Sequence, residues 1–138
     1  IGPFAFDGCS NLLFVVLPEG LLRLEDFAFS GCTSFRGEIV IPTSVQYMGD
    51  GIFYRCRSLE SVVFVPTPNM IPASVQYMGS AIFAECTSLE SVFFVPTPNM
   101  VELGSKMFSH CTNLRFVALP QNLRSIPAWF FSYCTSLT

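Results

Sequence analysis

The chain has 138 residues and a formal net charge of −3, with 51% hydrophobic and only 12% charged residues. This balance excludes a disordered chain, which needs few apolar and many charged residues, and the lack of a basic patch argues against nucleic acid as a partner. The longest apolar run, residues 12–17, is too short to span a bilayer, so we expect no membrane insertion by this segment.

A cysteine recurs at nearly constant spacing along the chain. The six positions are Cys9, Cys32, Cys56, Cys86, Cys111 and Cys134, with spacings of 23, 24, 30, 25 and 23 residues. A phenylalanine lies three residues before each cysteine, and a leucine or phenylalanine lies three residues after it. Such a period predicts stacked repeats. We expect about six coils over residues 1–138, and, because both ends fall in mid-unit, an excerpt from a longer array whose flanking repeats contact this segment.

The segment after each cysteine alternates at its end, as a half-buried strand must. It predicts parallel strands at 14–17, 38–41, 61–64, 91–94 and 116–119. One extra residue near Gly37 predicts a β-bulge at the strand entrance. The residues predicted to point inward are Val15, Leu17, Ile39, Ile41, Val62, Phe64, Val92, Phe94, Val117 and Leu119.

A second segment in each unit predicts a short helical turn. The residues that would cap these turns are Asp26, Asp50, Ser80 and Ser105. The phenylalanine and the cysteine that follow have the i, i+3 spacing of one helical face. Glycines just before the turns, at Gly2, Gly49, Gly79 and Gly104, suit a tight bend. The fold class is therefore an α/β solenoid, with short parallel strands on a concave face and short helical turns on a convex face.

Two tandem tiles, residues 41–70 and 71–100, are identical at 23 of 30 positions. The differing pairs are Thr43/Ala73, Asp50/Ser80, Gly51/Ala81, Tyr54/Ala84, Arg55/Glu85, Arg57/Thr87 and Val63/Phe93. The other large apolar positions are unchanged, which indicates a packed wall and a freely varying surface. The residues predicted to be buried in both tiles are Phe53, Leu59, Val62, Phe83, Leu89 and Val92.

Both tiles end in a P-T-P-N sequence that has neither strand nor helix chemistry. The residues are Pro66, Thr67, Pro68 and Asn69 in the first tile and Pro96, Thr97, Pro98 and Asn99 in the second. We expect them to protrude as loops on one edge of the solenoid. Two interpretations remain open: tolerated insertions, since loops lengthen at small entropic cost, or a contact site.

The cysteines predict a ladder of small, buried, reduced thiols. Equivalent side chains on neighbouring coils lie roughly 4.8 Å apart, beyond the ~3.8 Å between the Cβ atoms of a disulfide. Metal binding is not expected, since the sequence has no C-x-x-C and no second histidine to pair with His110. Neither a phosphate-binding loop nor paired carboxylates occur. We therefore expect no catalytic residue and no cofactor.

The outward positions of the predicted strands form the candidate partner-binding face. They are Phe14, Val16, Val40, Ser61, Val63, Ser91, Phe93, Phe116 and Ala118. Aligned across the strands, the apolar members could exceed the few hundred Å2 of apolar patch usual on a monomer. Such a patch indicates a protein partner of unknown identity, or a surface covered by flanking coils or a loop.

The repeated pattern is most complete in IGPFAFDGCSNLLFVVLP, MGDGIFYRCRSLESVVF, MGSAIFAECTSLESVFF and LGSKMFSHCTNLRFVALP. It resembles the BspA-like class of leucine-rich repeat, although Glu25 and Pro127 replace the glycine of the unit and Phe35 replaces its leucine. The resemblance implies a right-handed solenoid that acts in protein–protein interaction and cell adhesion, at the cell surface or secreted. An intracellular or organellar scaffold subunit is the alternative, favoured by six unpaired cysteines and the lack of an N-glycosylation sequon.

Overall fold

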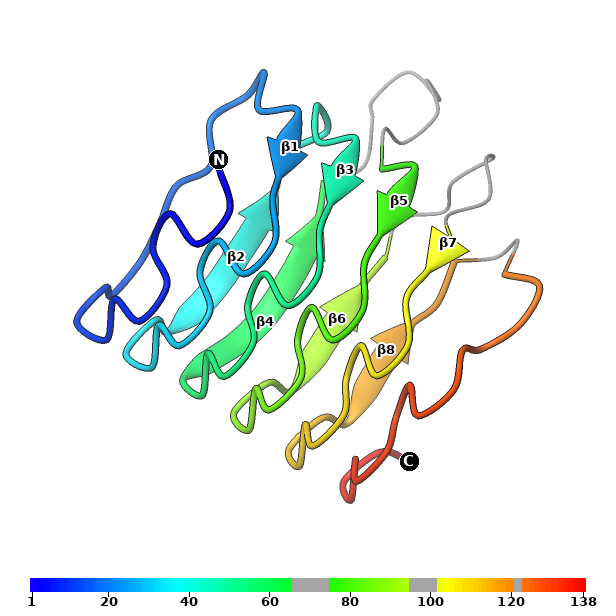
Figure 1. Cartoon of the computed structure of the whole chain (residues 1–138). Helices are drawn as coiled ribbons and strands as arrows, with labels where there is room; N and C mark the ends of the chain where they lie inside the picture. Colours follow the sequence, from blue (N-terminus) through cyan, green and yellow to red (C-terminus); the bar gives the residue numbers. More distant parts are fainter. Residues whose placement is uncertain (66–74, 95–101, 121–122) are drawn as a thin grey trace.

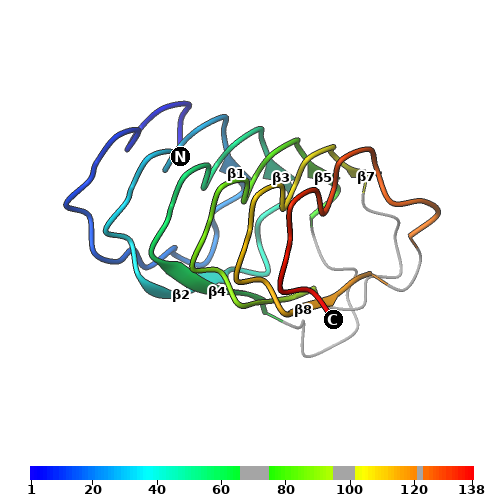
Figure 2. The same ribbon diagram turned by 90° about the horizontal axis from the view of Figure 1, so that it is seen from below.

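The computed structural model describes residues 1–65, 75–94, 102–120 and 123–138. The coils follow one another along a single axis, and the chain termini lie in the first and last coils (Figure 1). Two parallel four-stranded sheets run along the solenoid, on different sides of the coils (Figure 2). No helix occurs in the described ranges, and none therefore has the length and apolarity needed to cross a membrane. The predicted P-T-P-N loops at 66–69 and 96–99 lie outside the described residues.

The larger sheet contains four of the five predicted strands, in the order β2-β4-β6-β8. The strands are β2 (Gly37–Ile41), β4 (Leu59–Phe64), β6 (Ser91–Phe93) and β8 (Phe116–Ala118). The predicted bulge is confirmed, because the β2–β4 register shifts between Gly37 and Glu38, and Gly37 has a φ of 78°. The strand predicted at 14–17 is wrong. The carbonyl of Leu13 accepts a hydrogen bond from the N–H of Arg36, but no ladder continues from it through 14–17.

The predicted direction of the side chains in this sheet is confirmed. Ile39, Val62 and Val92 are aligned by the strand register and fully buried. Their neighbours in sequence alternate to the opposite face, as the two-residue period of a strand requires. If the predicted register had been wrong by one residue, the buried and the outward residues would have been exchanged.

The second sheet, of order β1-β3-β5-β7, was not predicted. Its strands have two residues each: β1 (Arg23–Leu24), β3 (Tyr47–Met48), β5 (Tyr77–Met78) and β7 (Glu102–Leu103). The second residue of each strand points inward: Leu24, Met48 and Met78 are buried, and Leu103 is partly buried. The first residue of each strand is more exposed than the second. Strands this short have too few residues to show an alternating pattern in the sequence.

The predicted helical turns are wrong, because two residues in each coil adopt the left-handed conformation. In the third coil these are Gly51 and Arg55, with φ of 57° and 60°. The N–H groups between them alternate in direction: Phe53 donates to the carbonyl of Ile82 in the next coil, whereas Tyr54 donates back to Gly51. The turn side is therefore a third hydrogen-bonded surface of the solenoid, since alternate N–H groups connect each coil to the next.

The predicted caps are also wrong, because their carboxylates bridge coils. Asp26 Oδ1 accepts a hydrogen bond of 2.9 Å from the N–H of Asp50, and Asp50 Oδ1 accepts one of 2.7 Å from the N–H of Ser80. Three of the four glycines just before the turns, Gly49, Gly79 and Gly104, likewise serve close packing rather than a bend, whereas a Cβ atom on Gly2 would meet nothing within 4 Å. A Cβ atom on Gly79 would lie 2.6 Å from the carbonyl carbon of Gly49, so only glycine lets the two backbones approach.

A stack of phenylalanine rings runs through the core along the solenoid axis. Phe29, Phe53, Phe83 and Phe108 are fully buried, with successive ring centroids 5.6, 5.7 and 5.5 Å apart and interplanar angles of 8° or less. Offset stacking of this kind adds to the stabilisation from burial. The stack therefore fixes the distance between coils.

The cysteine ladder lies beside this stack. From the second coil on, each thiol donates a hydrogen bond to the carbonyl of the phenylalanine in the preceding coil, as from Cys86 Sγ to Phe53 O at 3.1 Å. All six cysteines are free, and the four in the middle of the chain are buried. The prediction of burial is wrong for Cys9, which is exposed in the first coil, and Cys134 is only partly buried.

Candidate functional site

The outer sheet face consists of the outward side chains of β2, β4, β6 and β8. Strand register places Val40, Val63, Phe93 and Ala118 in one row, as the sequence predicted. Phe93 is 46% exposed and Phe116 on the next strand is 52% exposed. Their ring centroids lie 5.5 Å apart, which joins them into one aromatic surface.

Polar groups border this apolar row on the side of β2 and β4. Ser61 Oγ donates a hydrogen bond to Glu38 Oε2 at 3.2 Å, and Ser61, Ser91 and Phe116 occupy one row of the register. The face therefore changes from polar at Glu38 to aromatic at Phe116.

Phe14 and Val16 do not join this ladder, although the sequence placed them in the same rows. They lie in the first coil, outside any strand, and are 72% and 83% exposed. Of the predicted face, the structure thus aligns the residues from Val40 to Ala118 and leaves the first two without strand partners.

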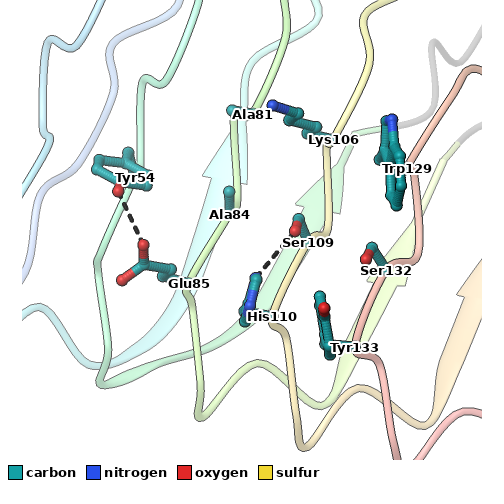
Figure 3. Close-up of a pocket in the computed structure, with 10 residues that line it drawn as sticks. All are labelled: Tyr54, Ala81, Ala84, Glu85, Lys106, Ser109, His110, Trp129, Ser132 and Tyr133. Atoms are coloured by element: carbon teal, nitrogen blue, oxygen red, sulfur yellow. Dashed lines mark hydrogen bonds between the residues drawn. The ribbon is translucent and has the colours of Figure 1, made fainter.

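A depression on the turn side, the turn groove, was missed by the sequence analysis (Figure 3). It has a volume of about 540 Å3. Its lining residues are Tyr54, Ala81, Ala84, Glu85, Lys106, Ser109, His110, Trp129, Ser132 and Tyr133. The groove spans residues that are far apart in sequence and that meet only because the coils stack.

Three rows of side chains shape the turn groove. The middle row has the short side chains of Ala84, Ser109 and Ser132, and the rows on either side carry the larger ones (Figure 3). Hydrogen bonds between coils hold these rows in register, since the N–H of Glu85 donates to the carbonyl of Ser109 and the N–H of His110 donates to that of Ser132. Short residues between large ones leave the open space.

Glu85 is the charged centre of the first part of the turn groove. Its carboxylate accepts hydrogen bonds from Tyr54 Oη at 2.8 Å and Arg55 Nε at 3.0 Å, and Arg57 lies 3.7 Å away. Burial raises the pKa of Glu85, but these hydrogen bonds and the two arginines outweigh it and lower the pKa overall. Glu85 is therefore an anion fully compensated by its neighbours rather than a proton-transfer group.

Aromatic and cationic side chains occupy the other part. The rings of His110 and Tyr133 are stacked, with centroids 4.4 Å apart, and His110 Nδ1 lies 3.0 Å from Ser109 Oγ. Trp129 is 68% exposed. Lys106 forms no ion pair among the residues that the structure describes.

The possible metal ligands and the cysteines are the other reactive groups of the described residues. No three His, Cys, Asp or Glu side chains within them lie close enough to hold a metal ion. Burial raises the pKa of the Cys32 thiol to about 11 and raises the pKa of Cys86 as well. These thiols stay protonated at neutral pH, so they are poor nucleophiles.

The family follows from the repeats themselves. Six copies of the BspA type leucine rich repeat region match the chain, and together they cover residues 1–138. The chain belongs to the BspA-type leucine-rich-repeat family. Modules of this family are typically non-catalytic and bind other molecules.

Solved structures with similar coils include the leucine rich repeat protein of T. pallidum, which is 24% identical with a TM-score of 0.72. The BspA-type chain aligns over 100% of its own length and 71% of that protein. A leucine rich cell surface protein of Faecalibacterium prausnitzii A2-165 is 22% identical with a TM-score of 0.46, at 99% and 49% coverage. A leucine-rich repeat protein of Bacteroides ovatus ATCC 8483 is 21% identical with a TM-score of 0.39, at 100% and 56% coverage. No curated protein matches the chain. The likeness to the T. pallidum protein shows the fold alone.

One signal in the sequence of this BspA-type chain does point to the turn groove. Of the seven differences between the tandem tiles, three involve lining residues: Gly51/Ala81, Tyr54/Ala84 and Arg55/Glu85. Positions that differ between near-identical tiles indicate surfaces at which the two coils have different roles. Without the stacking of the coils, these positions could not be recognised as neighbours.

Proposed function

We propose that this BspA-type solenoid is a non-catalytic module that binds a protein partner through the outer sheet face. The observation that carries the proposal is the uncharged row Val40–Val63–Phe93–Ala118, extended by Phe116. A contiguous apolar surface that remains exposed on a folded domain is typical of an interaction site. The fold does not need the aromatic ring of Phe93, because the twin position in the other tile is Val63.

The setting that the family resemblance supports is adhesion at a cell surface or after secretion. The partner would then be a host or matrix protein. The second candidate, a scaffold subunit inside a cell or organelle, is favoured by the free cysteines, because proteins in oxidising compartments often pair theirs. The two differ in their partners: an adhesin binds matrix proteins, whereas a scaffold subunit binds only its own assembly.

The rigidity of the sheet supports display rather than an adaptable surface. Behind the exposed row, Ile39, Val62 and Val92 are fully buried in a continuous core. A rigid face loses little conformational entropy when it binds. Binding energy should then concentrate at a few central aromatic residues.

The test compares Phe93→Ser with the tile-copying variant Phe93→Val. The native protein is screened for binding to immobilised collagen, laminin and fibronectin by biolayer interferometry. We expect Phe93→Ser to weaken the complex by at least ~2 kcal/mol, the scale of a hot spot, with the melting temperature nearly unchanged. The affinity of Phe93→Val should lie between that of the native protein and that of Phe93→Ser.

Three results would count against the proposal. Binding to none of these matrix proteins would contradict adhesion and favour the scaffold. Unfolding of Phe93→Ser would mean that Phe93 is structural. Unchanged binding in Phe93→Ser would remove the outer sheet face as the site.

A further inference from the structure

Several residues of the turn groove carry side chains although their backbone conformation favours glycine. Six of its ten lining residues have positive φ. In the first two coils the second left-handed position is Gly8 or Gly31, but in the last four it is Arg55, Glu85, His110 and Tyr133. A side chain in this conformation costs roughly 1–2 kcal/mol, which glycine avoids. The large residues are therefore retained at a cost to stability.

The difference between the twin tiles opens the turn groove. Tyr54 and Ala84 occupy equivalent positions, and a phenol ring at position 84 would occupy the middle row. At the next position, Arg55 is replaced by Glu85, whose carboxylate then bonds to both Tyr54 and Arg55. Tyr54 of the first tile thus closes one end of the turn groove, and Ala84 of the second tile leaves the middle row open.

The ligand must be recognised by side chains, because the backbone here is already used. The N–H groups of Glu85, Lys106 and His110 each donate to the next coil. A peptide therefore cannot add to the turn groove as an extra strand, which is one common way of binding an extended chain.

The groups that remain available suit a sugar ring that carries a negative charge. Trp129 presents an exposed flat indole, and aromatic rings of this kind pack against apolar C–H faces. The hydroxyls of Ser109 and Ser132 can both donate and accept hydrogen bonds. The ammonium of Lys106 has no ion-pair partner in the described part of the chain. The one carboxylate of the lining, Glu85, is already compensated by Arg55 and Arg57 and would repel an anion little.

We propose that the turn groove binds an extended acidic glycan, with a sugar ring stacked on Trp129 and its carboxylate at Lys106. The lining residues come from four successive coils along the solenoid axis, so successive sugars would meet successive coils (Figure 3). This site lies on the turn side, whereas the proposed protein-binding face is the β2-β4-β6-β8 sheet. The two sites are thus independent.

The test uses a hyaluronan octasaccharide as the acidic probe and chitohexaose as the neutral one, with affinities from titration calorimetry. Ala84→Tyr copies the twin residue and should close the groove without changing the melting temperature. Trp129→Ala copies Ala81 at the same left-handed position. We expect each to weaken hyaluronan binding by roughly tenfold or more, since exposed aromatic anchors dominate such sites. Phe93→Val, on the other face, is the matched control and should bind hyaluronan normally.

Lys106→Gln tests the charge. It should weaken hyaluronan binding, reduce its dependence on salt and leave the affinity for chitohexaose unchanged. No binding of hyaluronan by the native protein would overturn the proposal, as would full binding in both Ala84→Tyr and Trp129→Ala. Equal affinity for the two probes would overturn the acidic preference. A proline-rich peptide that competes for the groove with higher affinity than hyaluronan would make the occupant a peptide instead.

Discussion

Replacing Phe83 with alanine tests whether the ring stack holds the coils together. Phe83 is fully buried between Phe53 and Phe108, at centroid distances of 5.7 and 5.5 Å. The carbonyl of Phe83 also accepts the thiol hydrogen bond from Cys111, but the substitution leaves that backbone group in place. Only the ring is lost, so the measured change in stability reports on the stack.

Three contributions set the size of the effect. Burying a phenylalanine side chain stabilises a protein by roughly 1.5–3 kcal/mol. A cavity of roughly 80–100 Å3, at about 24 cal/mol per Å3, costs about 2 kcal/mol more. Each lost ring contact adds about 0.5–1.5 kcal/mol, offset in part by inward movement of the neighbouring rings. We therefore expect a loss of about 3–5 kcal/mol, the range usual for such substitutions.

Urea unfolding followed by tryptophan fluorescence and far-ultraviolet circular dichroism would measure this loss. Phe93→Ala is the control: it removes the same ring from the outer sheet face, where Phe93 is half-exposed, and should cost well under half as much. For a chain of this size, a loss of 4 kcal/mol corresponds to a fall of roughly 14 °C in melting temperature. Equal losses at the two positions would refute the assignment of inward and outward faces.

Three further predictions concern the contacts between coils. At pH 8, Cys9 should react with a thiol reagent in the folded protein, whereas Cys56, Cys86 and Cys111 should react only on unfolding; rapid labelling of all four would contradict the ladder. Burial raises the pKa of Cys32 from 9.0 to about 11. Its neutral thiol therefore contributes stability that is complete below pH 9 and lost as the pH rises towards 11. The urea midpoint of the native protein should fall across that range, and that of Cys32→Ala should fall less. Gly79→Ala should destabilise by about 1–3 kcal/mol, since its Cβ would meet the Gly49 backbone, while Gly2→Ala, at the same position of the unit but with nothing within 4 Å, should be nearly neutral; equal melting temperatures would refute the close approach.

The sequence predicted the larger sheet because its cues are local and repeated. Val62 and Phe64 alternate with Ser61 and Val63, and a similar pattern begins six or seven residues after each of the first five cysteines. Burial of one face then leaves a single register possible. The prediction of a strand at 14–17 was wrong although the apolar pattern there is similar. A ladder also needs hydrogen-bond partners on a neighbouring coil, and a local pattern does not show whether those bonds form.

The turns could not be predicted because their conformation has no residue signature. Phe27, Lys106 and Trp129 adopt left-handed φ values that favour glycine. Hydrogen bonds to the next coil hold Phe27 and Lys106 there, through their N–H groups and the carbonyls of Asp50 and Ala128. The same i, i+3 spacing of phenylalanine and cysteine that indicates a helix is here produced by two successive reversals of the chain.

The turn groove was missed for a related reason. Tyr54, His110 and Tyr133 are separated by more than twenty residues at each step, and each alone is an ordinary surface residue. Stacking of the coils brings the ring centroids of His110 and Tyr133 to 4.4 Å from each other and places Tyr54 at the end of the same depression. Sites of this kind are found by comparing equivalent positions of neighbouring coils, not by searching for motifs.

The thiol-to-carbonyl ladder gives the array a direction and makes its units interchangeable. Each cysteine from Cys32 on donates to the phenylalanine carbonyl of the coil before it, as Cys56 does to Phe29 and Cys111 does to Phe83. A coil inserted anywhere would offer a carbonyl to its successor and a thiol to its predecessor, so every junction would be satisfied as before. Unequal recombination can then lengthen or shorten the gene by whole coils while the protein still folds. The tandem tiles at 41–70 and 71–100 are the trace that such an event would leave, and each new copy supplies surface positions that are free to diverge.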